Sequence, residues 1–471
     1  MAKILFIEIN IMTEPLGIAS IAGTLNSHGH VCDVIFLSEE KDYLKYIKAT
    51  SPDIVGFSMI TGDTERRIEV MKTIKRHFNI PVIVGGPHAT LYPEELLSQE
   101  CIDICCVGDG ELSALALLNK IDAGDAAYDI KNIYYKKNGS VIKNDLCLTD
   151  INTLHDPDKS IYYKYDVLKN APMKRFITSY GCPYTCNYCW NHVYLAIFKE
   201  HGQYYRRKKC DKIIEEIRTT VEAGSHTRRI HFHDDIFNLP NSWLEEFCEK
   251  YKKAFPGLPW SCTVRIDLLN EGLIKKMKRG GCAGVTIGVE TADEEQRMLF
   301  LGKKITNRQY IDTCRMLYDY RIKILSSNMT NLLFEKIEDA VETLRFNSRL
   351  RVFGMRPAIL TIWKGQETFN QCVRHKAPII PLDKDGDSFV IANHDLEKFR
   401  KLNCIYNFLY TFKLVGFWKV FIALPMPLAF FRLFRLVDGY LEMRFFGLTI
   451  REGVKYYFKI QKEYSFMQRR R

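Results

Sequence analysis

The sequence predicts an α/β protein in three parts: an N-terminal doubly wound parallel sheet, a partial (β/α)6 barrel and a mostly helical C-terminal part. Short apolar strands alternate with helical segments twice along the chain, first in residues 1–125 and again in residues 166–368. Residues 126–165 separate the two series, and residues 369–471 are rich in aromatic and basic side chains. We therefore expect two α/β domains joined by a connector, followed by a helical C-terminal domain.

The composition is that of a globular protein. The chain has 471 residues, of which 46% are hydrophobic and 26% charged, values that exclude a disordered, collagen-like or coiled-coil chain. No apolar run reaches the roughly 20 residues of a membrane-spanning helix. Glu8 interrupts the apolar start, so we expect no secretion signal. Fifteen cysteines are too sparse for a disulfide scaffold, which favours reduced thiols in the cytoplasm.

The first series consists of five short apolar strands with helical segments between them. The predicted strands are Lys3–Ile9, Val31–Leu37, Asp53–Ser58, Pro81–Gly85 and Asp103–Val107. Strands that are apolar throughout belong to a parallel sheet covered by helices on both faces. Ligands of such sheets bind beyond the carboxyl ends of the strands.

Small and polar residues follow three of these strands. They form the groups Ser58 with Thr61, Gly85-Gly86-Pro87-His88, and Gly108-Asp109-Gly110-Glu111. Each glycine is open to a second interpretation, that it only makes a tight turn. Three such turns at one edge of the sheet favour a ligand.

The second series begins after the connector, which contains a predicted hairpin, Ile133–Tyr135 turning at Asn138-Gly139 into Val141-Ile142. Its six predicted strands are Arg175–Ser179, Arg228–His233, Trp260–Arg265, Gly284–Glu290, Ile322–Asn328 and Phe353–Trp363. Six β/α units suit a partial TIM-like barrel with its site at the strand carboxyl ends.

The most specific motif is a run of three cysteines after the first strand of the second series: Cys182, Cys186 and Cys189. Zinc is one interpretation, but a structural zinc site takes four ligands, usually in CxxC pairs, and the chain has no second pair. His192 is the available fourth ligand, and it would crowd one short turn with Cys189. An iron–sulfur cluster on three cysteines instead leaves one iron open to bind a substrate or cofactor.

The CxxxCxxC spacing, with the aromatic Tyr188 before the last cysteine, resembles the signature of radical S-adenosylmethionine (SAM) enzymes. The resemblance implies a 4Fe–4S cluster on Cys182, Cys186 and Cys189, with SAM on the open iron. It also implies that one electron cleaves SAM to methionine and a 5′-deoxyadenosyl radical. An electron donor such as flavodoxin or ferredoxin is therefore expected as a partner.

Later segments match the same family and imply further SAM contacts. The SAM-binding residues expected from the resemblance are Tyr188, Asp234, Asp235, Arg265, Gly288 and Glu290. Tyr188 is expected near the adenine, the two aspartates at the methionine ammonium group, Arg265 at its carboxylate, and Glu290 at the ribose or methionine end. Alternatively, the aspartates cap a strand end, and Arg265 and Glu290 form structural ion pairs.

The first domain resembles the cobalamin-binding domain that precedes the barrel in one large subclass of radical SAM enzymes. The residues expected at the cobalamin are Leu16, Gly17, Ser58, Thr61, Gly85, Gly86, His88, Gly108, Gly110 and Glu111. No Asp-x-His-x-x-Gly motif occurs, so the resemblance implies no histidine ligand on cobalt, and His88 is expected at the edge of the cofactor.

Two such cofactors imply an enzyme that uses a small-molecule substrate. The function we predict is cobalamin-dependent C-methylation of an unactivated carbon, with the protein supplying proximity and orientation. Two alternatives stay open. The first is a radical SAM cyclase or rearrangement enzyme, and the second, from another class, is a non-catalytic cobalamin- or metal-binding protein.

The C-terminal segment is strongly basic. Residues Lys401–Arg471 contain 13 Lys/Arg against 4 Asp/Glu, although the whole chain has a net charge of only +11. One interpretation is a helical cap over the barrel mouth with a solvated basic face. The other is an interfacial segment at the inner membrane face, which favours a lipid or isoprenoid substrate. Its aromatic and basic clusters are Phe417–Phe421, Phe430–Arg435, Tyr456–Lys459 and Arg469–Arg471. No nucleic-acid-binding motif is present, so we expect no nucleic-acid partner.

Overall fold

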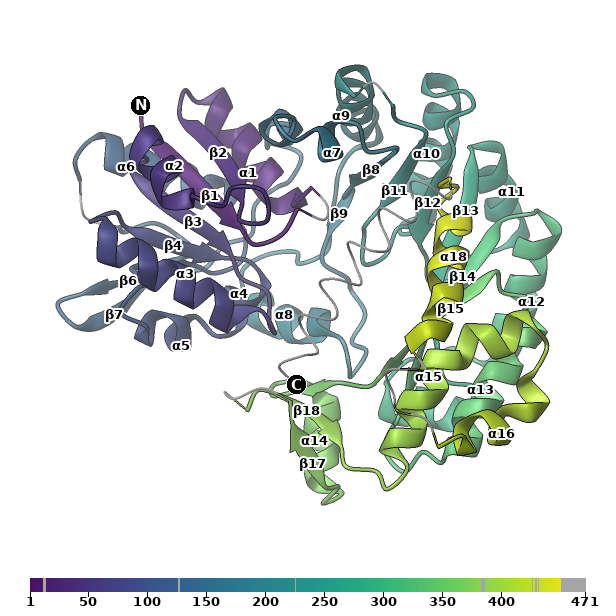
Figure 1. Cartoon of the computed structure of the whole chain (residues 1–471). Coiled ribbons are helices and arrows are strands. Elements are labelled where there is room, and N and C mark those ends of the chain that lie inside the picture. Colours follow the sequence, from purple (N-terminus) through teal and green to yellow (C-terminus); the bar gives the residue numbers. More distant parts are fainter. Residues whose placement is uncertain are drawn as a thin grey trace. The chain divides into compact units, whose positions relative to one another are not determined.

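A computed structural model of the chain describes residues 1–11, 14–125, 128–224, 226–382, 386–425, 427, 430 and 432–449 (Figure 1). Contacts divide the chain into two compact units. Unit 1 comprises Met1–Ala171 and Ile197–Thr227, and unit 2 comprises Pro172–Ala196 and Arg228–Arg471. The first predicted domain and the connector fall in unit 1, and most of the barrel falls in unit 2. The predicted boundaries of the four parts stay a prediction.

Unit 1 is built on one seven-stranded sheet in the order β2-β1-β3-β4-β5-β6-β7. The first five of these strands in chain order pair in parallel, and the last two join antiparallel. The strands are β1 (Lys3–Glu8), β2 (Val31–Phe36), β3 (Ile54–Ser58), β4 (Val82–Gly85), β5 (Ile104–Cys106), β6 (Ile133–Lys137) and β7 (Ser140–Lys143). All five predicted strands are confirmed. The predicted hairpin is also present, as β6 and β7, and it extends this sheet.

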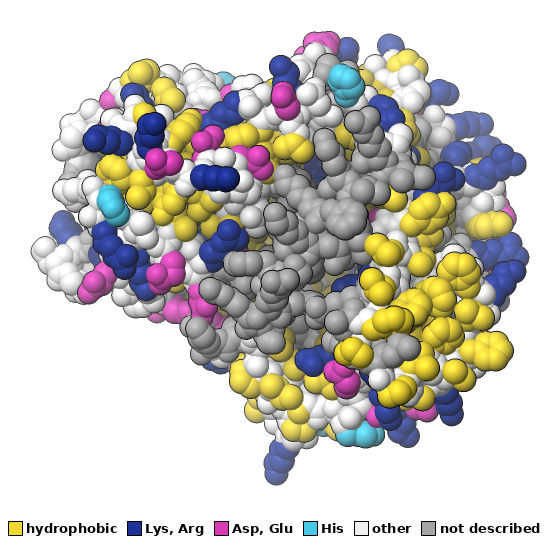
Figure 2. Space-filling model, in the orientation of Figure 1, with side chains coloured by type: hydrophobic (Ala, Val, Ile, Leu, Met, Phe, Trp, Pro, Cys, Tyr) yellow, Lys and Arg dark blue, Asp and Glu magenta, His cyan; other side chains and the backbone are white. Residues whose placement is uncertain are grey.

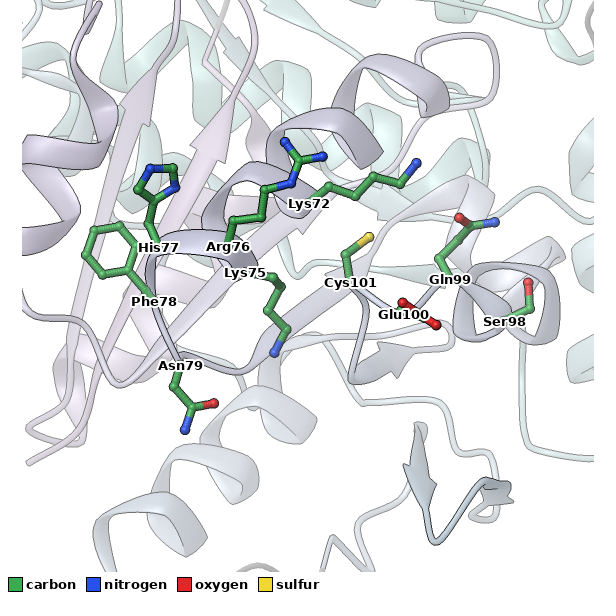
Figure 3. Close-up of a pocket in the computed structure, with 10 residues that line it drawn as sticks. All are labelled: Lys72, Lys75, Arg76, His77, Phe78, Asn79, Ser98, Gln99, Glu100 and Cys101. Atoms are coloured by element: carbon green, nitrogen blue, oxygen red, sulfur yellow. The ribbon is translucent and has the colours of Figure 1, made fainter.

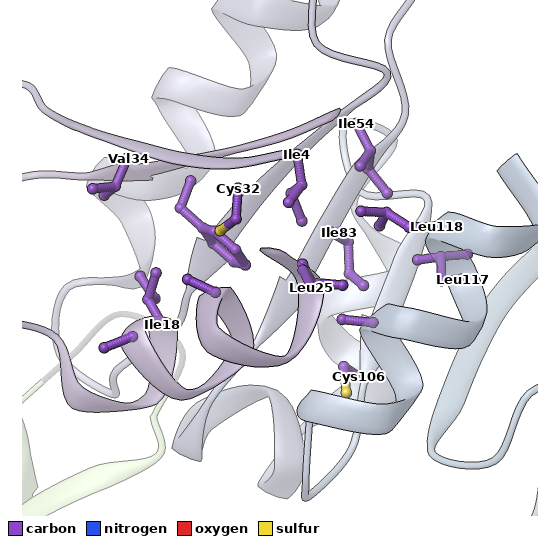
Figure 4. Packing of buried hydrophobic residues seen from close by; sticks show 14 of the residues in the cluster. Ile4, Ile18, Leu25, Cys32, Val34, Ile54, Ile83, Cys106, Leu117 and Leu118 are labelled. Atoms are coloured by element: carbon purple, nitrogen blue, oxygen red, sulfur yellow. The ribbon is translucent and has the colours of Figure 1, made fainter. Parts of the chain in front are cut away.

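Helices cover both faces of this sheet, so the strands bury side chains on both sides. On β1, Ile4 and Phe6 join the apolar cluster that contains residues of α1 (Leu16–Ser27) and α6 (Glu111–Asp122) (Figure 4). Leu5 joins the cluster on the other face. The helices of that face are α2 (Tyr43–Thr50), α3 (Thr64–His77) and α5 (Pro93–Ser98). The doubly wound prediction is therefore confirmed.

The strand order places a switch point between β1 and β3. The chain leaves β1 toward β2 on one side and reaches β3, β4 and β5 on the other. In open parallel sheets, ligands bind outside the carboxyl ends of the strands at such a point. In unit 1 this position is marked by Glu8, the last residue of β1, and Ser58, the last residue of β3.

Unit 2 is built on a second sheet of six parallel strands. From one edge to the other they are β15 (Gly354–Ile359), β14 (Lys323–Thr330), β13 (Cys282–Glu290), β12 (Trp260–Thr263), β11 (Arg229–Phe232) and β8 (Met173–Phe176). After β11, β12, β13 and β14 come, in turn, α10 (Asn241–Ala254), α11 (Glu271–Arg279), α12 (Asn307–Asp319) and α13 (Ile337–Leu350), and α8 (Trp190–Phe198) and α9 (Cys210–Ala223) lie between β8 and β11. Each strand overlaps a predicted one, so the (β/α)6 prediction is confirmed.

The barrel is partial because β8 and β15 are the two edges of this sheet. Helix α15 (Leu396–Thr411) packs along β15. Asn407 on α15 donates from Nδ2 to the carbonyl oxygen of Met355 at 2.7 Å, and its Oδ1 accepts from the Met355 amide at 2.9 Å. This side chain therefore satisfies both backbone groups that a further strand would bind at the edge.

Helix α18 (Leu436–Phe445) packs against the amino-terminal half of the barrel strands. Arg229, the first residue of β11, donates from Nη1 to the carbonyl oxygen of Phe445 at 2.9 Å. A Cβ atom at Gly284, near the start of β13, would lie 2.8 Å from the Phe445 ring. The interpretation that the tail caps the barrel mouth is wrong for this segment, because α18 closes the opposite rim.

The C-terminal part is substantially helical, as predicted, with α14 (Glu367–Arg374) and α16 (Trp418–Ala423) besides α15 and α18. It also contains a small antiparallel sheet that the sequence did not predict. Its strands are β16 (Ile362–Trp363), β18 (Ser388–Ile391) and β17 (Ile379–Pro381). Over the residues that the structure describes, no helix is long and apolar enough to cross a membrane. The clusters Tyr456–Lys459 and Arg469–Arg471 lie outside those residues.

Candidate functional site

The three cysteines predicted as cluster ligands lie on one loop of unit 2, between β9 (Ser179–Tyr180) and α8 (Trp190–Phe198): Cys182, Cys186 and Cys189. Asn187 anchors this loop, because its amide donates to the carbonyl oxygen of Leu301 at 2.9 Å and its Nδ2 donates to that of Phe300 at 3.0 Å. Gly302 has a φ of +65°, and a Cβ atom there would lie 2.7 Å from Asn187 Oδ1. The cysteine loop is therefore held against the segment that follows β13.

The environment of these thiols fits ligands of a cluster. All three are partly exposed, whereas eleven of the other cysteines are buried. Burial raises the pKa of Cys182 to about 12 and also raises the pKa of Cys189. The thiols of Cys182 and Cys189 therefore keep their protons until a cation replaces them, and iron would supply that charge.

A 4Fe–4S cluster and a single metal ion require different arrangements of their ligands. In the described part of the chain, no three His, Cys, Asp or Glu side chains gather where they would bind one metal ion. Each liganded iron of a cluster takes its own thiolate, so the three cysteines do not have to converge on one point. Three partly exposed cysteines on one anchored loop fit this requirement.

Asp234 and Asp235 follow β11 and have different surroundings. Asp234 is buried, and its Oδ1 accepts hydrogen bonds from Thr178 Oγ1 at 2.7 Å and Ser179 Oγ at 2.5 Å. It therefore braces the start of the cysteine loop. Asp235 is exposed, and its pKa is raised by the surrounding protein and lowered by a hydrogen bond from Asn191. The Asn191 amide also donates to Cys189 Sγ at 3.7 Å.

Of the two aspartates, Asp235 is thus the one available to a ligand beside the cysteines. Its predicted role toward the SAM ammonium group stays a prediction, as does that of Asp234.

Glu290 ends β13 in a strained conformation. Its φ is +65°, which non-glycine residues seldom adopt, and the register with β14 shifts between Gly288 and Glu290. Glu290 is buried, and Oε1 accepts from Tyr188 OH at 2.9 Å and pairs with Lys303 Nζ at 2.9 Å. The structure therefore brings two of the predicted SAM-binding residues, Tyr188 and Glu290, into direct contact.

Gly288 and Lys303 support this carboxylate. A Cβ atom at Gly288 would lie 2.0 Å from Glu290 Oε1 and 2.5 Å from Lys303 Nζ, so only glycine leaves room for the pair. The carboxylate of Glu290 raises the pKa of Lys303 well above its usual value. Sequence reasoning missed Lys303, because no motif or spacing links it to residue 290.

Arg265 follows β12 and lies against the cysteine loop. Its guanidinium carbon is 3.8 Å from the centroid of the Tyr184 ring, and its Nε is 2.9 Å from Asp267 Oδ1. The structural ion pair that the sequence left open is therefore present. Tyr184 lies between Cys182 and Cys186, so Arg265 is also placed beside the loop that holds the cluster ligands. Its predicted contact with the SAM carboxylate stays a prediction.

At the switch-point edge of unit 1, the turn after β4 lies against the end of β3. Gly86 has a φ of +92°, and a Cβ atom there would lie 3.1 Å from Ser58 Oγ. His88 is buried on α4 (Pro87–Leu91), and its Nδ1 lies 3.1 Å from Thr61 Oγ1. Ser58, Thr61, Gly86 and His88 are therefore brought together, as the sequence predicts, and Gly85 lies beside them at the end of β4.

The glycine-rich turn after β5 and the start of α6 pack closely against Phe198 and against residues of α1. A Cβ atom at Gly108, whose φ is +86°, would lie 2.6 Å from the Phe198 ring. Glu111 is buried and accepts from Ser20 Oγ at 2.7 Å, so it joins α6 to α1. A Cβ atom at Gly110 would lie 3.1 Å from Ile21 Cδ1. These contacts give Gly108, Gly110 and Glu111 structural roles, and their predicted cobalamin contacts stay a prediction.

Three features at this edge offer apolar contact and open space to the flat ring of a macrocyclic cofactor. Ile60, in the loop after β3, is 54% exposed, and Leu112, at the start of α6, is 46% exposed. Gly17, the second residue of α1 after the predicted Leu16, faces open space. Sequence reasoning missed Ile60 and Leu112, because a single apolar residue in a loop gives no periodic signal.

A pocket of about 840 Å³ lies elsewhere in unit 1 (Figure 3). Its lining residues are Lys72, Lys75, Arg76, His77, Phe78, Asn79, Ser98, Gln99, Glu100 and Cys101. Asn79 precedes β4 and Cys101 precedes β5, so the pocket opens at the amino-terminal edge of the sheet. It is therefore distinct from the switch-point site.

Two protein-family models match the chain. The B12 binding domain model matches residues 2–118, which run from β1 into α6. The Radical SAM superfamily model matches residues 176–346, which include the three cysteines and the strands from β11 to β14. The two matches lie in the two series that the sequence predicts.

The chain is similar to several curated proteins. It is 28% identical to an uncharacterised methyltransferase of Pyrococcus horikoshii, over 76% of this chain and 78% of the relative. It is 26% identical to the anaerobic magnesium-protoporphyrin IX monomethyl ester cyclase of Rubrivivax gelatinosus, over 76% of this chain and 66% of the relative. Against the hopanoid C-3 methylase of Methylococcus capsulatus the identity is 24%, over 62% of this chain and only 56% of the relative.

Solved structures share the fold. OxsB, a cobalamin-dependent SAM radical enzyme solved with aqua-cobalamin and SAM, superposes with a TM-score of 0.73 at 16% identity, over 95% of this chain and 72% of OxsB. TsrM, a radical SAM methyltransferase of Kitasatospora setae solved with cobalamin and a 4Fe–4S cluster, gives a TM-score of 0.66 at 16% identity. The match covers 80% of this chain and 75% of TsrM.

Proposed function

Because the chain belongs to the radical SAM superfamily and carries an N-terminal B12 binding domain, we propose that it methylates an unactivated carbon of a small molecule. It is a radical SAM enzyme whose cofactors are a 4Fe–4S cluster, SAM and cobalamin. The observation that carries the proposal is the coexistence of the anchored three-cysteine loop with the B12 binding domain. A relative named as a methyltransferase supports methylation.

The residues of this chain would hold the cofactors in two places. Cys182, Cys186 and Cys189 would bind the cluster, and the edge formed by Ser58, Gly85, Gly86 and the exposed Ile60 would hold cobalamin. When bound, the cluster and SAM supply a radical that removes hydrogen from carbon, and cobalamin supplies the methyl group.

Two carboxylates near the cysteine loop, those of Glu290 and Asp235, would orient SAM. The carboxylate of Glu290 is buried and is held in place by Lys303 and Tyr188. Asp235 offers a second carboxylate beside the cysteines, where an ammonium group would form a charge-assisted hydrogen bond. These contacts position a substrate relative to the cluster, which is the protein's part in such chemistry.

The second candidate function is a radical SAM cyclisation or rearrangement. The cyclase of Rubrivivax gelatinosus, at 26% identity, favours it. Both candidates need the same cofactors and differ in whether a methyl group reaches the substrate.

The test uses anaerobically reconstituted full-length protein with cobalamin, a low-potential reductant and SAM labelled in the methyl group. A cell extract of small molecules serves as the substrate source. Methylation predicts label in a product together with 5′-deoxyadenosine, and both disappear in Cys186→Ser. Cys147→Ser, a partly exposed cysteine outside the loop, keeps both. Deoxyadenosine without labelled product contradicts methylation and favours the second candidate.

We also propose that the enzyme acts in the cytoplasm, takes electrons from a flavodoxin or ferredoxin, and touches the inner membrane face. The face that carries α15 and α16 gathers hydrophobic side chains (Figure 2). Phe412, Phe417 and Val420 are 57%, 60% and 61% exposed. Lys413 and Lys419 are exposed among them, and this mixture suits anionic headgroups. Membrane contact would give the enzyme access to a lipid or isoprenoid substrate.

Vesicle flotation tests the membrane contact. Vesicles of phosphatidylglycerol should carry the full chain upward, and the double variant Phe417→Ser, Val420→Ser should lose most of this binding. Val167→Ser, which removes an exposed apolar residue from unit 1, is the matched control. Truncation of the tail is unsuitable, because α15 and α18 bury side chains against the barrel. Equal flotation of the double variant and the control contradicts the proposal.

A further inference from the structure

A buried ion pair lies at the switch-point edge of unit 1. Glu8 ends β1, and Arg67 lies in the first turn of α3. Arg67 Nη2 donates to Glu8 Oε2 at 2.9 Å, and the Arg67 and Glu8 side chains are only 5% and 9% exposed. A buried charge pair of this kind adds little to stability, because removing both groups from water costs about as much as their attraction returns. The pair therefore calls for a role other than stability.

This pair passes over the carboxyl ends of the strands. Side chains alternate between the two faces of β1, and Ile4 and Phe6 pack on the face that α1 and α6 cover. Glu8 follows in the same alternation, whereas Arg67 comes from α3, which covers the other face. Their contact therefore crosses the edge of the sheet at which open parallel sheets bind ligands.

Three polar atoms of the pair have no hydrogen-bond partner in the described part of the chain. They are Glu8 Oε1 and Arg67 Nε and Nη1, and none of them is exposed to solvent. The Arg67 Nε atom lies 3.5 Å from Asp63 Oδ2, which is an ion pair without a hydrogen bond. Buried polar groups are almost always hydrogen-bonded, because leaving them unpaired is costly. A bound group that satisfies these atoms would explain them.

The unpaired atoms specify what such a group must offer. Arg67 donates and the free oxygen of Glu8 accepts, so the group must do both. A carboxamide carries a carbonyl oxygen and an NH₂ group side by side. A phosphate would only accept, and it would lie against the carboxyl group of Glu8. The pair is connected to the surface through Asp63, whose side chain is 21% exposed, and Ile60 is exposed in the same loop.

We propose that Arg67 and Glu8 bind a carboxamide side chain at the rim of the corrin ring and so fix the orientation of cobalamin at this edge. The inference rests on the proposed function, because it takes cobalamin as the ligand of unit 1. Cobalamin carries carboxamides around its ring, whereas its phosphate lies in the nucleotide tail. Ser58, Gly86 and Ile60 offer small or apolar contacts, and a few precisely placed polar groups are what orients a ligand in such a site.

Binding of hydroxocobalamin and of cobinamide to the cluster-reconstituted full chain tests the proposal. Both corrinoids carry the ring carboxamides, but cobinamide lacks the nucleotide tail with its phosphate. Arg67→Lys keeps a cation beside Glu8 but has one nitrogen in place of three. It should weaken binding of both corrinoids about tenfold, because a charge-assisted hydrogen bond is lost. Equilibrium dialysis measures the affinities, with SAM and reductant left out.

The double variant Glu8→Leu, Arg67→Met separates binding from stability. Apolar side chains often replace a buried ion pair without loss of stability, so urea unfolding should show it at least as stable as the wild type. Its affinity for both corrinoids should nevertheless fall tenfold or more. Lys75→Met is the matched control, because Lys75 lies two turns further along α3 and pairs with Asp103 at 2.7 Å before β5. It should bind both corrinoids like the wild type.

The outcomes separate this inference from the proposed function. A wild type that binds neither corrinoid contradicts the proposed function, and the inference fails with it. If the wild type binds, and Arg67→Lys and the double variant bind equally well, the pair is only structural and the inference alone is overturned. A loss of affinity for hydroxocobalamin but not for cobinamide would assign Arg67 to the phosphate, which also overturns it.

Discussion

At the residue scale, the group with the most constrained geometry is Glu290 with its two partners. A buried carboxylate in the left-handed region carries both backbone strain and a desolvation cost. Lys303 and Tyr188 offset the charge, and Gly288 leaves the space in which Lys303 reaches it. This arrangement fixes the carboxylate at the end of β13, beside the segment that anchors the cysteine loop.

Replacing Lys303 tests this arrangement. Lys303→Met should lower the free energy of unfolding by about 3–5 kcal/mol, because it leaves a buried carboxylate without its cation. Adding Glu290→Gln should restore much of the loss, because the orphaned charge is then gone. Urea unfolding measures both, with Lys304→Met, an exposed neighbour, as the control. Equal stability of Lys303→Met and Lys304→Met would show that the Glu290–Lys303 ion pair does not stabilise the folded protein.

A second buried acid predicts a pH dependence. Burial raises the pKa of Glu335 from 4.5 to about 8, although its Oε2 accepts from the Leu332 amide at 2.8 Å. The folded state therefore binds more protons than the unfolded state between these two values, so the free energy of unfolding falls as pH rises through that window. Glu335→Gln should flatten this fall and should be more stable than the wild type near pH 9.

Urea unfolding at about pH 5 and about pH 9 checks this expectation. Glu338→Gln, an exposed acid three residues on, should keep the wild-type dependence. If Glu335→Gln and Glu338→Gln show the same pH profile, Glu335 is ionised in the folded protein and the account of its burial is wrong.

Sequence reasoning found the residues that belong to local motifs and missed those that meet only in space. Cys182 and Glu290 lie in recognisable runs next to predicted strands. Lys303 has no such signal, because no motif or spacing joins it to Glu290, 13 residues before it. Asp234 and Glu111 show the converse. Both lie in recognisable motifs, but each makes structural hydrogen bonds that the sequence spacing does not reveal.

At the element scale, the strands were predictable because each is a short apolar run bounded by turn residues. The exceptions are β17 and β18, which are short and include the exposed Pro381, so neither length nor apolar pattern marks them. The predicted strand Phe353–Trp363 also divides into β15 and β16. The position of α18 was not predictable either. Its contact with the barrel depends on Gly284 and Arg229, which lie far from it in sequence.

Packing of α18 predicts a penalty for a side chain at position 284. Gly284→Val should lower the free energy of unfolding by about 1–3 kcal/mol or more, because the new atoms overlap the Phe445 ring. It should also expose α18 to protease. Gly416→Ala, where a Cβ atom meets open space, should have little effect. If both variants resist unfolding and proteolysis equally, α18 does not close the amino-terminal rim.

At the scale of the whole molecule, each of the two α/β units contains a different candidate cofactor site. Unit 1 has the switch-point edge of a B12 binding domain, and unit 2 has an anchored three-cysteine loop at one end of a parallel barrel. The alternation of strands and helices was enough to predict both units. The substrate was not predictable, because no motif in the sequence specifies it.

Cys182, Cys186 and Cys189 are proposed to hold a 4Fe–4S cluster whose open iron binds SAM. Electron paramagnetic resonance of the anaerobically reconstituted, reduced protein tests it most directly. We predict about four irons per chain, a signal of a reduced 4Fe–4S cluster, and a change in that signal on adding SAM. Bound zinc in place of iron, or a cluster signal that SAM leaves unchanged, would contradict the account.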